Sequence, residues 1–156
     1  MKYEIADKYR RMLRAYERLR VICTDNGNTI DNASPRDLAE AFFSQCYHLK
    51  DYIKKERPDA PDVEAYINKT GPLRIAADFC NSEKHAGLDR KPRAGEKISA
   101  ILVHMKMDYL PGRFRASGRV EIRLGEKSYD ALKLATDCVK GWDKYLKQAC
   151  IEIPPV

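Results

Sequence analysis

Long apolar runs are missing from this sequence of 156 residues. No stretch approaches the ~20 consecutive apolar residues that a helix needs to cross a bilayer, so we expect no membrane partner. The chain has charged residues at Lys2 and Glu4 and no apolar segment directly after them. We therefore expect no secretory signal and a cytoplasmic location.

Cysteine and histidine are few and irregularly placed. The five cysteines form no Cys-x-x-Cys pair, which argues against a disulfide framework and a zinc site. The three histidines lack the spacing of metal ligands, so we expect no metal and no cofactor. Cys46, Cys80 and Cys138 lie on apolar helical stripes and are predicted to be small core residues.

Several catalytic motifs are also absent. The chain contains no glycine-rich phosphate loop, no His-Glu-x-x-His and no Gly-x-Ser-x-Gly. These absences argue against P-loop nucleotide hydrolysis, zinc-dependent proteolysis and the nucleophile elbow of serine hydrolases.

The composition is that of a folded chain. Apolar residues make up 44% of the sequence and charged residues 33%, enough to bury a core. The length fits a single domain over residues 1–156. Apolar positions repeat at helical spacing in four segments, which predict helices over about 3–24, 35–57, 72–86 and 127–149.

Local signals mark where the predicted helices begin and end. Ser34 followed by Pro35 is typical of an N-cap and the first helical position, and Pro58 ends the same helix. A short helical piece is expected after Pro61, and Gly87 is a plausible C-cap. The four main helices are predicted to share one core that includes Phe42, Leu49, Phe79, Cys138 and Trp142.

The period changes to two between about residues 98 and 124, which predicts a β-hairpin. Leu110-Pro111-Gly112-Arg113 fits a type II turn, and we expect a bulge near Gly118. The predicted fold class is mainly α: an up-down bundle of about four helices with a β-hairpin inserted before the last helix.

The net charge is concentrated in one stretch. Residues 84–123 contain 10 Lys/Arg and 4 Asp/Glu, a surplus of six, and the whole chain has 29 and 23, also a surplus of six. A local positive field attracts phosphate backbones, so RNA or another nucleic acid is a candidate partner. The candidate binding residues are Arg90, Lys91, Arg93, Arg113, Arg115, Arg119 and Arg123, with His104 and Lys106 on the facing strand. The alternative is a solvated strand face, and Glu121 interrupts the row.

The third predicted helix has a polar face formed by Arg74, Asp78, Asn81 and His85, with Lys84 adjacent. His85 could act as a general base, and Asn81 or Lys84 could hold a phosphate. The alternative is a solvated helix face with an Arg74–Asp78 ion pair.

A second histidine lies on the helix predicted over 35–57. His48 and Asp51 are three residues apart and could pair, with the carboxylate fixing the imidazole tautomer. The alternative is a surface contact, and the sequence leaves open whether His48 and His85 lie in one site.

Two short motifs resemble a known group of proteins. Phe43 to Asp51 contains His-Leu-Lys-Asp, and Ala77 to His85 ends in Asn-x-x-Lys-His. Both resemble uncharacterised bacterial and phage proteins, which are more loosely similar to the HEPN superfamily of helical bundles. Many HEPN members are RNA-cleaving toxins or defence factors that act as dimers. The resemblance covers residues 36–90.

The HEPN ribonuclease motif has an arginine four to six residues before its histidine, and this chain has none there. Arg74 is eleven residues before His85, about 16 Å along a helix. The resemblance implies catalytic residues at His85, Asn81 and Lys84, with possible support from His48, Asp51, Arg74 and Asp78.

Two functional classes remain open. One is an RNA-binding or metal-independent RNA-cleaving module of a toxin or defence system. The other is a non-enzymatic interaction protein that forms a dimer. A homodimer is expected from the resemblance and from a second apolar row, Phe43 and Tyr47, on the second helix.

Overall fold

The computed structural model describes residues 4–24, 34–84 and 92–156, without the side chains of 83, 84, 106–110 and 113–117. His85, Gly87, Arg90 and Lys91 therefore lie outside the described residues. The elements in chain order are α1 (Glu4–Cys23), α2 (Pro35–Glu56), α3 (Val63–Lys69), α4 (Gly71–Lys84), β1 (Ile98–Leu110), β2 (Arg113–Leu124), β3 (Lys127–Asp130) and α5 (Ala131–Gln148).

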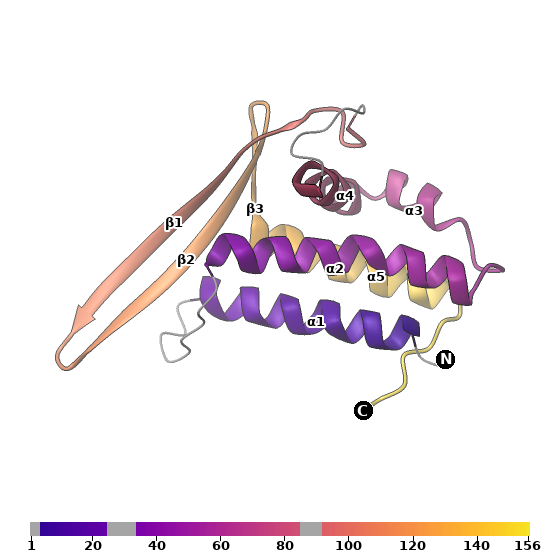
Figure 1. Ribbon diagram of the computed structural model, residues 1–156, viewed down its shortest axis with the longest axis horizontal. Coiled ribbons are helices and arrows are strands. Elements are labelled where there is room, and N and C mark those ends of the chain that lie inside the picture. Colours follow the sequence, from indigo (N-terminus) through magenta and orange to yellow (C-terminus); the bar gives the residue numbers. More distant parts are fainter. Residues whose placement is uncertain (1–3, 25–33, 85–91) are drawn as a thin grey trace.

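The helices form a bundle, and the strands extend from one end of it. Helices α1, α2 and α5 run alongside one another, α4 crosses them, and the β1–β2 hairpin projects away from the bundle (Figure 1). The strands form an antiparallel sheet in the order β1-β2-β3. The prediction of a mainly helical protein with antiparallel strands before the last helix is confirmed.

The helix ends follow the local signals. Ser34 Oγ accepts a hydrogen bond from the backbone N–H of Asp37 at 3.1 Å, and Pro35 occupies the first turn of α2. Helix α2 ends at Glu56, and its C-cap Arg57 directly precedes Pro58. N-caps such as Ser34 satisfy N–H groups that have no partner within the helix, so the residues directly before a helix fix its start.

The start of the last helix was predicted wrongly. Residues 127–130 form β3, which pairs with β2 from Leu124↔Lys127 to Glu121↔Asp130. Gly125 has a φ of 58°, which lets the chain reverse directly after β2. Asp130 then accepts a hydrogen bond from the backbone N–H of Lys133 at 3.0 Å and fixes the start of α5.

The expected bulge at Gly118 is also absent. Gly118 pairs with Met105 in regular register, and the register shift lies between Ile98 and Ala100. Gly118 has a different role, because a Cβ built on it would lie 2.5 Å from Pro35 Cγ. The glycine lets the hairpin approach the first turn of α2 closely.

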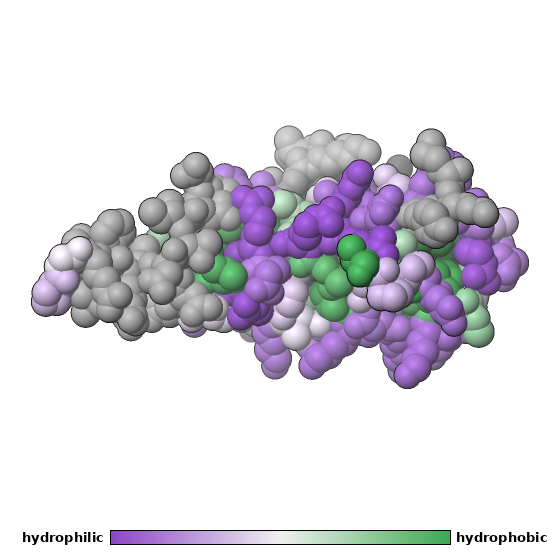
Figure 2. All heavy atoms as spheres, turned by 90° about the horizontal axis from the view of Figure 1, so that it is seen from below, coloured by the Kyte–Doolittle hydropathy of each residue, from purple (hydrophilic) through white to green (hydrophobic). Residues whose placement is uncertain are grey.

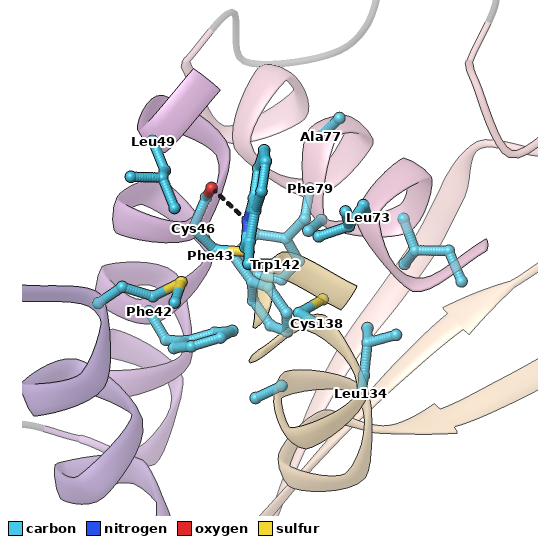
Figure 3. Packing of buried hydrophobic residues seen from close by; sticks show 14 of the residues in the cluster. Phe42, Phe43, Cys46, Leu49, Leu73, Ala77, Phe79, Leu134, Cys138 and Trp142 are labelled. Carbon is cyan, nitrogen blue, oxygen red and sulfur yellow. Dashed lines mark hydrogen bonds between the residues drawn. The ribbon is translucent and has the colours of Figure 1, made fainter. Parts of the chain in front are cut away.

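The predicted core is confirmed. Phe42, Leu49, Phe79, Cys138 and Trp142 are each at most 1% exposed. The indole of Trp142 lies between α2 and α4, and its Nε1 donates a hydrogen bond to the backbone oxygen of Cys46 at 3.0 Å (Figure 3). Burying a large apolar side chain is worth about 1.5–3 kcal/mol, so this cluster holds the helices together. Cys46, Cys80 and Cys138 are all buried, as predicted.

The second apolar row on α2 does not form a free surface. Phe43 is 0% exposed, and its ring centroid lies 4.9 Å from that of Phe79 on α4. Helix α4 crosses α2 and covers this row, which the periodicity of α2 alone could not indicate. On the face seen from below in Figure 2, described apolar residues appear as small patches between hydrophilic ones.

Candidate nucleic-acid interface

The strand register fixes which residues of the hairpin share a face. Residues paired across an antiparallel ladder point to the same side, and alternate residues point to opposite sides. Arg119 pairs with His104, and Arg123 pairs with Ala100. Gly112 has a φ of 76°, as the predicted turn requires. The alternation that the sequence predicted is therefore present in the ladder.

One face of the hairpin is basic and open to solvent. Arg119 and Arg123 are exposed, and the His104 side chain is 48% exposed. We call Arg119, Arg123 and His104 the basic face. Arg113 and Arg115 belong to the same alternation in β2, and their side chains lie outside the described part of the structure.

Glu121 is the carboxylate within this basic face. It accepts a hydrogen bond from Ser128 Oγ, its Oε2 lies 2.9 Å from His104 Nε2, and its Oε1 lies 3.1 Å from Arg123 Nε. The hydrogen bonds from Ser128, His104 and Arg123 lower the pKa of Glu121 to about 2. Glu121 is therefore ionised at neutral pH and offsets one positive charge of the face.

The opposite face of the hairpin changes along its length. Val120 and Ile122 are 0% exposed and pack on the bundle, whereas Val103 is 38% and Met105 is 52% exposed. The part of the hairpin nearest the helices is thus a wall of the core. Val103 and Met105 are the exposed part of this apolar face, and the ribbon itself projects away from the bundle (Figure 1).

Arg93, another predicted binding residue, is engaged within the fold. Its Nη2 lies 2.9 Å from Glu64 Oε2, and its Nη1 donates to Asn68 Oδ1 at 3.1 Å. The guanidinium also lies over the Tyr47 ring, 5.7 Å from its centroid. These contacts hold Arg93 against Tyr47 of α2 and against Glu64 and Asn68 of α3, so Arg93 connects the segment after α4 to both helices.

Glu64 collects three cations that the sequence did not connect. Lys50 and Lys54 reach its Oε1 at 3.1 Å and 2.6 Å, and Arg93 reaches the other oxygen. Burial raises the pKa of Glu64, but the hydrogen bonds from Lys54, Lys50 and Arg93 outweigh it and lower the pKa to about 2. Residues from three separate segments meet here: α2, α3 and the segment after α4. No local sequence pattern indicates such a cluster.

The polar face predicted on α4 is not a solvated surface. Asp78 is 2% exposed and accepts hydrogen bonds from the backbone N–H groups of Arg93 and Ala94, both at 2.8 Å. Burial raises the pKa of Asp78, while these two donors oppose the shift. The alternative, a solvated face with an Arg74–Asp78 ion pair, is not found in the described residues, although the charge of Arg74 also acts to lower the pKa of Asp78. Asn81 is half-buried on the same helix.

The predicted catalytic set is only partly described. Lys84 ends α4, and its side chain lies outside the description together with all of His85. On α2, His48 Nδ1 lies 3.4 Å from Ser44 Oγ, and Asp51 accepts a hydrogen bond from Lys50 Nζ at 3.1 Å. Each of these two contacts joins neighbours on the same helix.

Sequence reasoning missed a cavity at the base of the hairpin. Arg74, Lys127 and Lys133 line it, and only Arg74 had been singled out. Asp130, a residue type that is favoured at N-caps, was a signal that a helix begins at this point. Nothing in the sequence indicated that the start of α4 lies opposite.

The described part of the chain was also searched for metal and membrane features. It contains no group of three or more histidine, cysteine or acidic side chains placed to hold a metal ion. None of its helices combines the length and apolar character needed to cross a membrane.

Comparisons with other proteins assign no family. None of the protein-family models, curated proteins or solved structures compared with this chain matches it.

Proposed function

We propose that this protein binds nucleic acid, RNA in the first place, through the basic face of the β1–β2 hairpin. The observation that supports this proposal is the position of Arg119, Arg123 and His104 on one solvent-exposed face of a ribbon that projects from the bundle. Half of the positive surplus of residues 84–123 lies on the same ribbon, which contains five Lys/Arg and two Asp/Glu.

The shape and charge of the ribbon suit a phosphate backbone. A two-stranded ribbon can lie along a groove or a backbone, and arginine side chains position it through phosphate contacts. Such contacts contain no sequence information, so we expect binding to depend on salt and little on base sequence. Base stacking is not expected, because the described side chains of the basic face include no aromatic ring besides His104.

The resemblance to HEPN proteins favours RNA over DNA as the target and a role in a bacterial toxin or defence system. We keep cleavage as part of this proposal, centred on His85. Binding through the hairpin does not require it.

The test compares two double variants that each remove two positive charges. Arg119→Gln with Arg123→Gln changes the basic face, and Lys144→Gln with Lys147→Gln changes exposed residues of α5. Binding of a fluorescent single-stranded RNA is measured over a range of salt concentrations. Each phosphate contact contributes about 0.7 to the log–log salt slope, so the first variant should lose up to about 1.4 from the slope.

The outcome separates specific placement from net charge. The α5 variant should bind almost as the unmodified protein does, because its charges lie away from the ribbon. Equal loss in both variants would mean that only net charge matters. No RNA binding by the unmodified protein at low salt would refute the proposal. Adding Arg113→Gln and Arg115→Gln extends the test along β2.

A second candidate function is supported by the other face of the hairpin. Val103 and Met105 are exposed apolar residues on β1 and could contact a second copy of the chain, as the expected homodimer requires. Light scattering should then give a mass of about twice the 17.9 kDa of one chain. The double variant Val103→Thr with Met105→Gln should lower this mass toward that of a single chain. A mass of one chain at high concentration would rule this candidate out.

A further inference from the structure

A cavity of about 500 Å³ lies where the start of α4, the start of α5 and strand β3 meet. This volume is typical of small-molecule sites. Arg119, Arg123 and His104 are not among the described residues that line it. The cavity adjoins the basic face, because Ser128 of its wall donates a hydrogen bond to Glu121, but the three basic side chains of that face do not line it.

Arg74 is the arginine of the cavity wall. Its Nε is buried and has no hydrogen-bond partner among the described residues. Asp78, the acid one turn further along α4, is occupied by the backbone N–H groups of Arg93 and Ala94. A buried donor without an acceptor costs free energy, so such a group calls for an explanation. An oxyanion bound beside the Arg74 guanidinium would give this side chain an acceptor.

Arginine also restricts what that oxyanion can be. The guanidinium presents its donors in a planar fork that matches a carboxylate or a phosphate with two parallel hydrogen bonds. Helix α4 begins at Gly71, one turn before Arg74, and both line the cavity. The partial positive charge at a helix start adds to the attraction for an anion.

The other charged residues of the cavity wall further restrict which ligands can bind. Lys127 and Lys133 are exposed cations in the wall, and Glu96, Asp130 and Asp137 are acids in it. With Arg74, these six charges sum to zero. Three acids repel a dianion such as a phosphate monoester. A ligand with one negative group and several hydrogen-bond donors can place its negative group at the cations and its donors at the acids. Asp130 already caps α5, which leaves Glu96 and Asp137 as acceptors.

We propose that this cavity binds a small carboxylate that also contains an ammonium or hydroxyl donor, an α-amino acid or an α-hydroxy acid. Arg74 binds the carboxylate, and the donor faces the acids of the wall. Both ligand types share the carboxylate, and they differ in the donor that they offer to Glu96 and Asp137.

The test is an amide NMR titration of the full chain with pooled L-amino acids, with lactate and with inorganic phosphate. We expect shifts at Gly71, Arg74 and Lys133 with the amino acids or lactate, and weaker binding of phosphate. Arg74→Gln should weaken binding at least tenfold. Arg14→Gln, which removes an exposed arginine of α1 that is not in the cavity wall, should leave it unchanged.

Three results would overturn the proposal. They are the absence of shifts with every carboxylate at millimolar concentration, equal affinity of the Arg74→Gln variant, and tighter binding of phosphate than of any carboxylate. If Arg74→Gln does not fold, Arg74→Lys keeps the charge and removes the fork, and it should still weaken binding several-fold. RNA binding by the hairpin should be the same in all these variants.

Discussion

The buried carboxylate of Asp78 accepts a hydrogen bond from the backbone N–H of Arg93, 15 residues further along the chain, at 2.8 Å. A second bond, from Ala94, completes the arrangement. One acidic residue of α4 thus holds the segment that leads into β1. This contact adds to the packing of Val120 and Ile122 in holding the hairpin against the bundle.

Replacing Asp78 by alanine should therefore destabilise the protein. A hydrogen bond to a charged group is worth about 1.5–3 kcal/mol, and two backbone donors would lose their acceptor. We expect a loss of at least about 2 kcal/mol in the free energy of unfolding, measured by urea denaturation. Asp78→Asn keeps one carbonyl oxygen and should lose less. Equal stability of the alanine variant would contradict this role.

Glu64 should make the stability depend on acidic pH. Its pKa in the folded state is about 2, below the ordinary 4.5, because Lys54, Lys50 and Arg93 hold the ionised form against the cost of burial. A lowered folded-state pKa stabilises the fold above the ordinary pKa, and this stabilisation is lost as the pH falls from about 4.5 toward 2. Thermal unfolding of Glu64→Gln should show a weaker decline over this window. Glu152→Gln, in the exposed C-terminal segment, should decline as the unmodified chain does.

The sequence predicts best what is decided locally. The N-cap at Ser34 and the turn at Gly112 depend on a few adjacent residues, so their positions were predicted correctly. Strand β3 was missed because four residues are too few to show a period of two. They are a strand only because Gly125 turns the chain back onto β2.

The burial of Asp78 and Phe43 was missed for a different reason. Helical periodicity placed Asp78 on a polar face and Phe43 on an apolar one, and both placements agree with the structure. Periodicity does not indicate what covers a face. The segment after α4 folds over Asp78, and α4 itself covers Phe43, so both are buried within the chain.

Gly118 should tolerate no side chain. A Cβ at this position would lie 2.5 Å from Pro35 Cγ and 3.1 Å from Met105 Sδ. Because the proline ring is rigid, Gly118→Ala should push the hairpin away from α2 and cost about 1–3 kcal/mol of stability. Gly141→Ala is the matched control. Gly141 lies within α5, and a Cβ there would meet its nearest neighbour, Thr70 Cγ2, at 3.4 Å. The control should be neutral or stabilising.

Any metal-independent RNA cleavage should depend on His85. A positioned general base accelerates such a reaction about 10²–10⁴-fold, so the His85→Ala variant should lose most of the cleavage rate. Asn81→Ala should lower it by weakening phosphate positioning. The measurement uses a mixed RNA pool in EDTA with variants matched for folding. Cleavage that is equal in His85→Ala, or absent from the unmodified chain, would leave RNA binding as the function to test.

Glu121 gives the sharpest test of the basic face, because its replacement should improve binding. The carboxylate engages His104 and Arg123 and is ionised at neutral pH. Glu121→Gln removes the negative charge and keeps a side chain of the same shape, so the Arg123 guanidinium no longer faces a carboxylate and becomes available to phosphates. We expect tighter RNA binding at low salt and a steeper salt slope. Glu126→Gln makes the same change in net charge in the turn after β2, and should have a smaller effect. Weaker binding by Glu121→Gln would mean that Glu121 positions the basic face rather than masking it.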